Sequence, residues 1–327
     1  MELCRVTRSY GGFLVVHVRD EGDNLMESLQ EVIGICLEAD CPLHISHLKV
    51  SGKKNWGRAA EALMLLEEAR EQGLELTFDQ YPYIAGSTML DAVLPPRFLA
   101  GGTAAMLENL KRPEVRQELT RILQGETQER FENLVKACGW DGIVVSSVAS
   151  EANLSAEGKN IASLAAELGK TPVDVVCDLL IAENNAVTQT MFYGSEDDVK
   201  KIMQSEYMTL CTDGIAGGKP HPRVYGSTAR FLGKYVREEG ALSLPQAVRR
   251  LTSLPAQRLR LQDRGLVREG MVADITVFDP ETIRDRGTYA DPNQYPAGIE
   301  YVLVAGQVAV EQGRLTGVRA GQVLRRR

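Results

Sequence analysis

The chain of 327 residues is 44% hydrophobic and 25% charged, an ordinary balance for a globular protein with a sizeable core. Its net charge of −7 lacks the basic surplus that phosphate binding needs, so nucleic acid is not an expected partner. No apolar run approaches the roughly 20 residues of a membrane span, and the N-terminal stretch "MELCRVTRSYGG" lacks the apolar core of a signal peptide, so no membrane association is expected. Six scattered cysteines without a CxxC pair predict reduced thiols and a cytoplasmic location.

The first third of the chain alternates between strand and helix patterns. Three β-rich runs and two amphipathic helix patterns alternate at residues 11–20, 24–40, 42–50, 58–73 and 74–83. Units of about 30 residues with this order are typical of parallel βαβ architecture. We therefore expect an α/β fold with a parallel sheet, in which His17 and His47 occupy equivalent places in neighbouring units.

The pattern changes twice further along the chain. Residues from about 88–203 contain several helical patterns, which predict a long, mainly helical insertion. A buried strand over residues 205–214 ends near Asp213, and more helical patterns follow it. Short β-runs separated by glycines then predict a β-sandwich portion, so that the expected domains are residues 1–262 and 263–327.

Polar side chains stand at the ends of the first strands. Because side chains alternate between the two faces of a strand, His17 should share a face with Arg19. By the same rule His47 shares a face with Lys49, while His44 points the other way and is expected to pack against a helix or hydrogen-bond to it. Each histidine also has a structural interpretation, as an ordinary hydrogen-bonded residue at a strand end.

The carboxyl ends of parallel strands meet at one edge, where the active sites of α/β barrels form. Asp213 belongs to that edge, although an acid before a glycine also suits a helix cap. Two imidazoles and a carboxylate that converge there suit zinc, and nearby cations suit an anionic substrate. Tyr83 and Ser87 either line the same cleft or pack a loop, and His221, in "KPHPR", belongs either to the site or to a surface loop.

Nine stretches stand in a recognisable order along the chain: "HVRDEGD", "HISHLKVSGKKNWG", "DQYPYIAGST", "LPPRFLAGG", "CTDG", "PHPRVYG", "TSLPA", "RGLVREGMVADITVFDP" and "YVLVAGQVAVEQG". Together they resemble the D-aminoacylases, the N-acyl-D-amino-acid deacylases of the amidohydrolase superfamily. The resemblance covers nearly the whole chain. It implies the C-terminal portion, about the last four βα units, of a metal-dependent TIM-type (β/α)8 barrel with a helical insertion and a small β-sandwich.

The resemblance also implies roles for particular residues. His17 and His47 fall on the family's zinc ligands, and Asp213 falls on its catalytic aspartate. Lys49 is implied to help hold the substrate carboxylate. Weaker candidates for the same substrate-binding cleft are Arg19, Tyr83, Ser87, His221 and Arg223. The implied substrate is a small N-acylated amino acid.

The sequence departs from this family at its N-terminal side. The family's first strand carries an HxH pair and its second a metal-binding cysteine. No HxH occurs here, and Cys4, which precedes His17, lies in a predicted helix. The first strand of this chain corresponds to the family's fifth, so the N-terminal part of the barrel is expected to be lacking. We expect either a piece of a longer protein or a half-barrel that a partner chain or self-association closes.

The expected function is zinc-dependent hydrolysis of the amide bond of N-acyl-D-amino acids, crippled in this chain if the missing ligands are essential. Two alternatives stay open. A non-catalytic remnant or subunit of an amidohydrolase would keep the fold elements without a complete metal site. Another cyclic-amide hydrolase of the superfamily would share "ADITVFD" with this chain but not "YPYIAGST".

Overall fold

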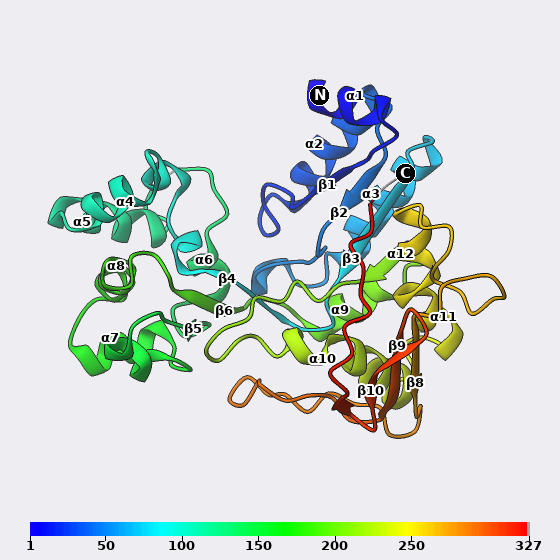
Figure 1. The fold of residues 1–327 in the computed structure, drawn as a ribbon. Helices are drawn as coiled ribbons and strands as arrows, with labels where there is room; N and C mark the ends of the chain where they lie inside the picture. Colours follow the sequence, from blue (N-terminus) through cyan, green and yellow to red (C-terminus); the bar gives the residue numbers. More distant parts are fainter. Residues whose placement is uncertain (128, 326–327) are drawn as a thin grey trace.

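The computed structural model describes residues 1–127 and 129–325, and its central element is a parallel sheet with the strand order β1-β2-β3-β7 (Figure 1). The strands are β1 (Leu14–Val16), β2 (Leu43–Ile45), β3 (Leu76–Gln80) and β7 (Met208–Leu210). Every neighbouring pair in this sheet is parallel. The sheet confirms the α/β fold class predicted from the alternation of strand and helix patterns.

Helices lie before, between and after these strands, and most of them bury apolar side chains in the core beside the sheet. They are α1 (Glu2–Ser9), α2 (Leu25–Glu38), η1 (Lys53–Asn55), α3 (Ala59–Glu71), α9 (Glu196–Met203), α10 (Arg223–Arg230), η5 (Phe231–Glu238), α11 (Leu244–Leu251) and α12 (Ser253–Arg258). In α2 the helical spacing of Leu25, Leu29 and Cys36 places all three in the same core as Leu43 and Ile45 of β2. Burial of such a stripe, rather than intrinsic propensity, supplies most of a helix's stability in a folded protein.

The insertion forms a second body with its own sheet and core, on the left in Figure 1. Its antiparallel sheet has the order β4-β6-β5 and consists of β4 (Ala85–Met89), β5 (Ile143–Ser147) and β6 (Thr188–Phe192). Its helices are η2 (Leu90–Val93), η3 (Pro96–Leu99), α4 (Gly102–Leu110), α5 (Pro113–Leu123), α6 (Leu134–Cys138), η4 (Glu151–Ala156), α7 (Ile161–Leu168) and α8 (Pro172–Ala182). The helical patterns are therefore present, but they pack on strands that the sequence patterns did not reveal.

Local sequence explains where several of these helices begin. The side chain of Thr171 accepts a hydrogen bond from the backbone N–H of Asp174, and Pro172 occupies the first turn of α8. Ser195 caps α9 in the same way, by accepting from the N–H of Asp198. Helix α9 falls inside the range predicted for the insertion, but its buried side chains join the core of the parallel sheet.

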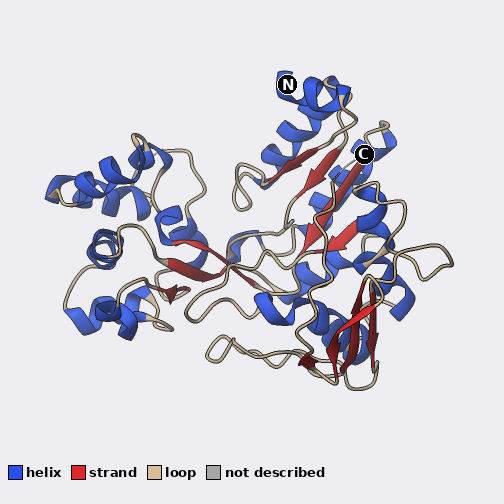
Figure 2. Cartoon of the chain, in the orientation of Figure 1, coloured by secondary structure: helices blue, strands red, loops and turns tan. Residues whose placement is uncertain are grey.

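The C-terminal part contains an antiparallel sheet of order β11-β10-β9-β8. Its strands are β8 (Ile275–Phe278), β9 (Ile299–Val304), β10 (Gln307–Glu311) and β11 (Arg314–Leu315) (Figure 2). The segment between β8 and β9 reaches the insertion, where the ring of Tyr289 lies 4.7 Å from that of Phe192. The strands of this sheet lie where the glycine-separated β-runs predicted strands. The domain boundary at residue 263 stays a prediction.

The parallel sheet has two open edges within the described chain. Strand β1 pairs there with β2 alone, and β7 pairs with β3 alone. Val15 of β1 is 54% exposed, Leu3 of helix α1 is 83% exposed, and Tyr10, just after that helix, is 82% exposed. A closed barrel has no such edge. The four strands therefore form an open arc rather than a closed barrel.

Two further observations concern the whole described chain. None of its helices combines the length and the apolar character that crossing a membrane requires. All six cysteines are described, and each carries a free thiol. The cytoplasmic location stays a prediction.

Candidate active site

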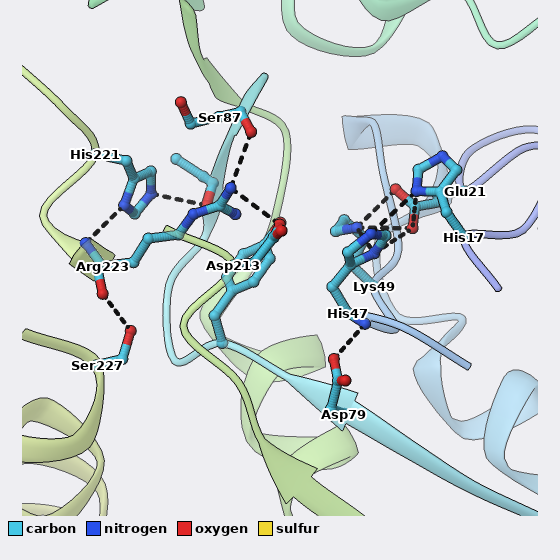
Figure 3. A network of polar contacts seen from close by, with 12 residues as sticks. His17, Glu21, His47, Lys49, Asp79, Ser87, Asp213, His221, Arg223 and Ser227 are labelled. Atoms are coloured by element: carbon cyan, nitrogen blue, oxygen red, sulfur yellow. Dashed lines mark hydrogen bonds and ion pairs between the residues drawn. The ribbon is translucent and has the colours of Figure 1, made fainter. Parts of the chain in front are cut away.

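Two histidines meet at the carboxyl ends of β1 and β2. His17 follows the last residue of β1 directly, and His47 lies two residues beyond the end of β2. His17 Nδ1 is 3.1 Å from His47 Nε2, with the ring centroids 4.8 Å apart (Figure 3). The structure thus brings together the two imidazoles that the sequence placed in neighbouring units.

The backbone explains how His47 reaches this position. Its φ of 41° is left-handed, which no regular strand allows, so the alternation of faces ends at Ile45. His44 keeps its place on the strand, where its Nδ1 lies 2.7 Å from Thr77 Oγ1 and its Nε2 lies 2.9 Å from Asp79 Oδ2. The prediction that His44 would turn toward a helix is wrong, since both of its partners lie on the neighbouring strand β3.

Glu21 stands at the centre of this group, although the sequence patterns did not single it out. Its Oε1 is 3.0 Å from His47 Nδ1, and both of its carboxylate oxygens are 2.7 Å from Lys49 Nζ. Burial by itself raises the pKa of Glu21, but the Lys49 ammonium and the hydrogen bond with His47 lower it to about 2. The sequence signal that could have identified Glu21 as a site residue was its place in "HVRDEGD", four residues after His17.

The histidine pair suits a metal ion such as zinc. Among the described residues, ligand atoms of His17, Glu21 and His47 lie within 4.8 Å of one another. Two imidazole nitrogens that face each other at 3.1 Å can share one cation, and zinc accepts histidine nitrogens readily. Burial lowers the pKa of His17 below its ordinary value, which favours the neutral form that binds metals, while the Glu21 and Asp213 carboxylates oppose that shift.

A second group of polar residues faces the histidines. Asp213 follows β7, and its Oδ2 is 2.9 Å from Nη2 of Arg223. The same Nη2 donates to the backbone oxygen of Ser87 at 2.9 Å. The side chain of Arg223 is 1% exposed, and its Nε and Nη1 have no hydrogen-bond partner among the described residues. In the view of Figure 3 the Asp213 carboxylate lies between this guanidinium and the histidine group.

One cavity of about 460 Å³ joins the two groups. The predicted site residues in its lining are His17, Arg19, His47, Lys49, Ser87, Asp213 and Arg223. Arg19 lies at the rim, where its side chain is 76% exposed and pairs with Glu31 at 2.8 Å. The apolar part of the lining includes Leu94, Leu99, Phe131, Leu134, Met191 and Ile215. The cavity is therefore polar on the side of the parallel sheet and largely apolar on the side of the insertion.

Tyr83 and His221 lie outside this lining. His221 is buried, its Nε2 donates to the carbonyl oxygen of Ala85 at 2.9 Å, and its Nδ1 accepts from the backbone N–H of Arg223 at 3.0 Å. The ring of Tyr83 packs edge-on against that imidazole, with the centroids 4.9 Å apart. Both residues therefore support Arg223 from behind the cavity, rather than facing a bound molecule themselves.

Comparison with known proteins identifies the family of the chain. Residues 1–310 match the profile of the Amidohydrolase family. A D-aminoacylase from Alcaligenes xylosoxydans xylosoxydans is 34% identical over 327 residues, and an N-acyl-D-glutamate deacylase from the same organism is 31% identical over 327 residues. These alignments cover 100% and 99% of this chain but 57% and 56% of the relatives, so the chain spans less than two thirds of their length.

A solved structure with a similar fold belongs to a protein with a related name. The N-acyl-D-glutamate deacylase of Bordetella bronchiseptica, complexed with zinc and a phosphonate inhibitor that mimics the tetrahedral intermediate of its reaction, is similar with a TM-score of 0.79 and 31% sequence identity. The match covers 99% of this chain and 58% of that protein. The shared fold is that of the amidohydrolase TIM-type barrel, of which this chain holds a part.

Proposed function

The chain belongs to the amidohydrolase family, and we propose that it carries the acid, the substrate anchor and two zinc ligands of an N-acyl-D-amino-acid hydrolase. One observation carries the proposal: the histidine pair and the Asp213–Arg223 pair line the same cavity. The names of the relatives, a D-aminoacylase and an N-acyl-D-glutamate deacylase, give the substrate class.

His17 and His47 are the residues that would hold zinc. Zinc, when bound, supplies Lewis-acid polarisation of a carbonyl group. Beside the histidines, the buried carboxylate of Glu21 and the ammonium of Lys49 compensate each other's charge. Two nitrogen ligands leave the remaining coordination positions for other groups.

Asp213 is proposed as the general base and acid. Its carboxylate would accept a proton from water as the new carbon–oxygen bond forms, and return that proton to the nitrogen as the amide carbon–nitrogen bond breaks. The ion pair with Arg223 at 2.9 Å holds the carboxylate in place at the cavity, where its side chain remains 40% exposed. Water can therefore reach it.

Arg223 is proposed to anchor the free carboxylate of the substrate. Its buried guanidinium has two donor nitrogens without partners in the described part of the chain, and buried donors of this kind are costly unless a ligand satisfies them. Lys49, which the resemblance assigns to the same carboxylate, is already bound to both oxygens of Glu21. The apolar wall of the insertion would then receive the acyl group or the amino-acid side chain.

We further propose that additional strands close the open arc, supplied by a partner chain or by a second copy. The exposed Val15 and the exposed apolar side chains of α1 form a surface that such strands would cover. Light scattering of the purified chain tests this proposal. A stable, monodisperse monomer that also hydrolyses substrate would contradict it.

Hydrolysis is tested by incubating the chain and zinc with N-acetyl-D-amino acids and measuring the free amine released. We expect release from D- but not from L-enantiomers, and its loss in Asp213→Ala. Activity that survives this substitution would rule out the proposed role of the acid.

A non-catalytic subunit is the second candidate, favoured by one observation. Among the described residues, the cluster of potential ligand atoms offers two histidines and a carboxylate that is already paired with Lys49. Zinc analysis after dialysis separates the two proposals. One zinc ion per chain supports the hydrolase, and its absence from every assembly state supports the subunit.

A further inference from the structure

Glu21 is held more firmly than its position in a loop suggests. Its side chain is buried, its backbone N–H donates to Oε1 of Glu132 at 3.3 Å, and its carbonyl oxygen accepts from the N–H of Ser51 at 2.8 Å. The main chain is thus tied both to the insertion and to the segment that follows His47. A buried carboxylate with a fixed backbone can orient its neighbours without much loss of side-chain entropy.

Three nitrogen-bearing groups converge on this carboxylate. Lys49 Nζ lies 2.7 Å from each oxygen, His47 Nδ1 lies 3.0 Å from Oε1, and His17 Nδ1 lies 3.6 Å from the same oxygen (Figure 3). Lys49 Nζ also approaches His47 Nδ1 at 2.8 Å. The imidazole nitrogen therefore has two possible partners, and they require opposite protonation states.

The choice of partner decides whether His47 can bind a metal. If Nδ1 carries the hydrogen and donates to Glu21, Nε2 keeps a lone pair that can bind a metal. If Nδ1 accepts from Lys49 instead, Nε2 carries the hydrogen and has no lone pair for a metal. The first arrangement suits the geometry better, because the Lys49 ammonium already has both Glu21 oxygens at 2.7 Å as acceptors.

Direct ligation of a metal by Glu21 fits the contacts less well. The ammonium of Lys49 lies against both carboxylate oxygens, and it would repel a divalent cation placed there. The oxygen also faces Nδ1 of His47, whereas the nitrogen that faces His17 is Nε2. Oε1 of Glu21 lies 3.6 Å from His17 Nδ1 as well, so it is the Lys49 ammonium, rather than distance, that opposes ligation by the carboxylate.

We propose that Glu21 is a positioning residue, which fixes His47 in the tautomer whose Nε2 is free to bind the metal, and that Lys49 in turn fixes Glu21. This inference rests on the proposed function, because it assumes that the histidine pair binds zinc. It also changes the role of Lys49 from a substrate anchor to a support of the metal site. Carboxylates that orient metal-bound histidines typically contribute 10- to 100-fold to metal affinity.

Zinc affinity of the purified chain, measured by competition with a chromophoric chelator, provides the first test. We expect Glu21→Gln to weaken zinc binding about 10- to 100-fold. Loss of a negative charge alone would also weaken binding, so a second variant is needed. Glu21→Met combined with Lys49→Met removes the pair, leaves the net charge unchanged and leaves no buried charge without a partner. We expect it to weaken binding at least about tenfold.

The matched control is Glu31→Gln, the same substitution in an exposed acid that pairs with Arg19. It should leave zinc affinity unchanged. If the double variant binds zinc as tightly as the wild type, Glu21 acts through its charge and the positioning role is overturned. If Glu21→Gln changes the ligand-field spectrum of the cobalt-substituted chain, Glu21 is itself a ligand, which also overturns the proposal.

A metal-free measurement keeps the test independent of the proposed function. Long-range proton–nitrogen NMR correlations distinguish the two imidazole tautomers, and we expect His47 to carry its hydrogen on Nδ1 in the wild type. The double variant should lose that preference. A wild-type His47 that carries its hydrogen on Nε2 would contradict the inference even if no zinc binds, whereas absence of zinc binding with the expected tautomer would count against the hydrolase alone.

Discussion

The two ends of the cavity differ in how their charges are satisfied. At the histidine end, the buried Glu21 carboxylate and the Lys49 ammonium neutralise each other, and two imidazoles face one another. At the other end, the buried guanidinium of Arg223 has, among residues 1–127 and 129–325, one carboxylate partner, Asp213, and two donor nitrogens without a partner. The first arrangement suits a cation, and the second suits an anion. A molecule with a carbonyl to polarise and a carboxylate to anchor would fit between them.

The strongest test of this comparison removes one group from each end. We expect His47→Asn to abolish the zinc retained after dialysis, because one of two nitrogen ligands is lost. Asp213→Asn should keep the zinc and lose at least about 100-fold in hydrolysis, because it removes the proton acceptor. Metal analysis and amine release measure the two effects. Equal loss of zinc in both variants would show that the acid belongs to the metal end.

Removing the unpaired donors is the next largest change. Arg223→Met should weaken binding of N-acetyl-D-leucine by roughly 10- to 100-fold, since a hydrogen bond to a charged group contributes about 1.5–3 kcal/mol. Calorimetry measures the affinity, and Arg223→Lys should retain part of it. The amide N-acetyl-D-leucinamide serves as the control ligand because it lacks the carboxylate. If its affinity falls equally, Arg223 does not recognise the carboxylate.

A pair of neighbouring acids sharpens the comparison further. Burial and the Glu21 carboxylate raise the pKa of Glu132 to about 8, whereas the pKa of Glu21 is lowered to about 2. In the unfolded chain Glu132 loses its proton above pH 4.5, the ordinary pKa of a glutamate, whereas the folded chain keeps that proton up to about pH 8. The stability from this group is therefore complete below pH 4.5 and lost as the pH rises through 8.

Glu132→Gln tests that sign, because its amide resembles the protonated acid. We expect the variant to melt at the same temperature as the wild type at pH 5 and about 2 °C higher at pH 9, near the shift that 1 kcal/mol produces in a large domain. Thermal unfolding followed by circular dichroism measures the difference. Glu31→Gln is the control, and its difference from the wild type should not change with pH.

The smallest effect is expected at the rim. Arg19 is exposed and pairs with Glu31 in solvent, where ion pairs contribute little. Arg19→Ala should therefore change substrate affinity and hydrolysis by less than about twofold. A larger loss of hydrolysis or affinity in steady-state kinetics would place the Arg19 side chain within reach of the substrate. The anion-binding part of the cavity would then include its rim.

Sequence patterns predicted the fold better than the contacts of the site. The period of the strands and helices located the parallel sheet, and the 30-residue spacing placed His17 and His47 together. Alternation failed at His47, because the strand ends at Ile45 and this left-handed residue redirects the chain, so the face inferred for His44 from His47 was wrong. Glu21 had no periodic signal at all, since its role depends on contacts with residues more than 25 positions away.

The insertion shows the same limit on a larger scale. Its helices were visible as amphipathic patterns, but the sheet that holds them is formed by β4, β5 and β6, whose paired residues are 41 to 107 positions apart. Such pairings leave no short-range mark in a sequence. The apolar wall that this body contributes to the cavity was hidden for the same reason.

The sequence alone determined the periodic elements, the residue types at strand ends and the order of the family's motifs, because these depend on neighbours within a few positions. Tertiary structure alone decided which nitrogen of each imidazole faces the other, which acid each cation pairs with, and which donors of Arg223 remain unpaired. Those outcomes depend on distances of about 3 Å between segments remote in the chain, and hydrogen bonds and ion pairs weaken or vanish when such distances change by an ångström.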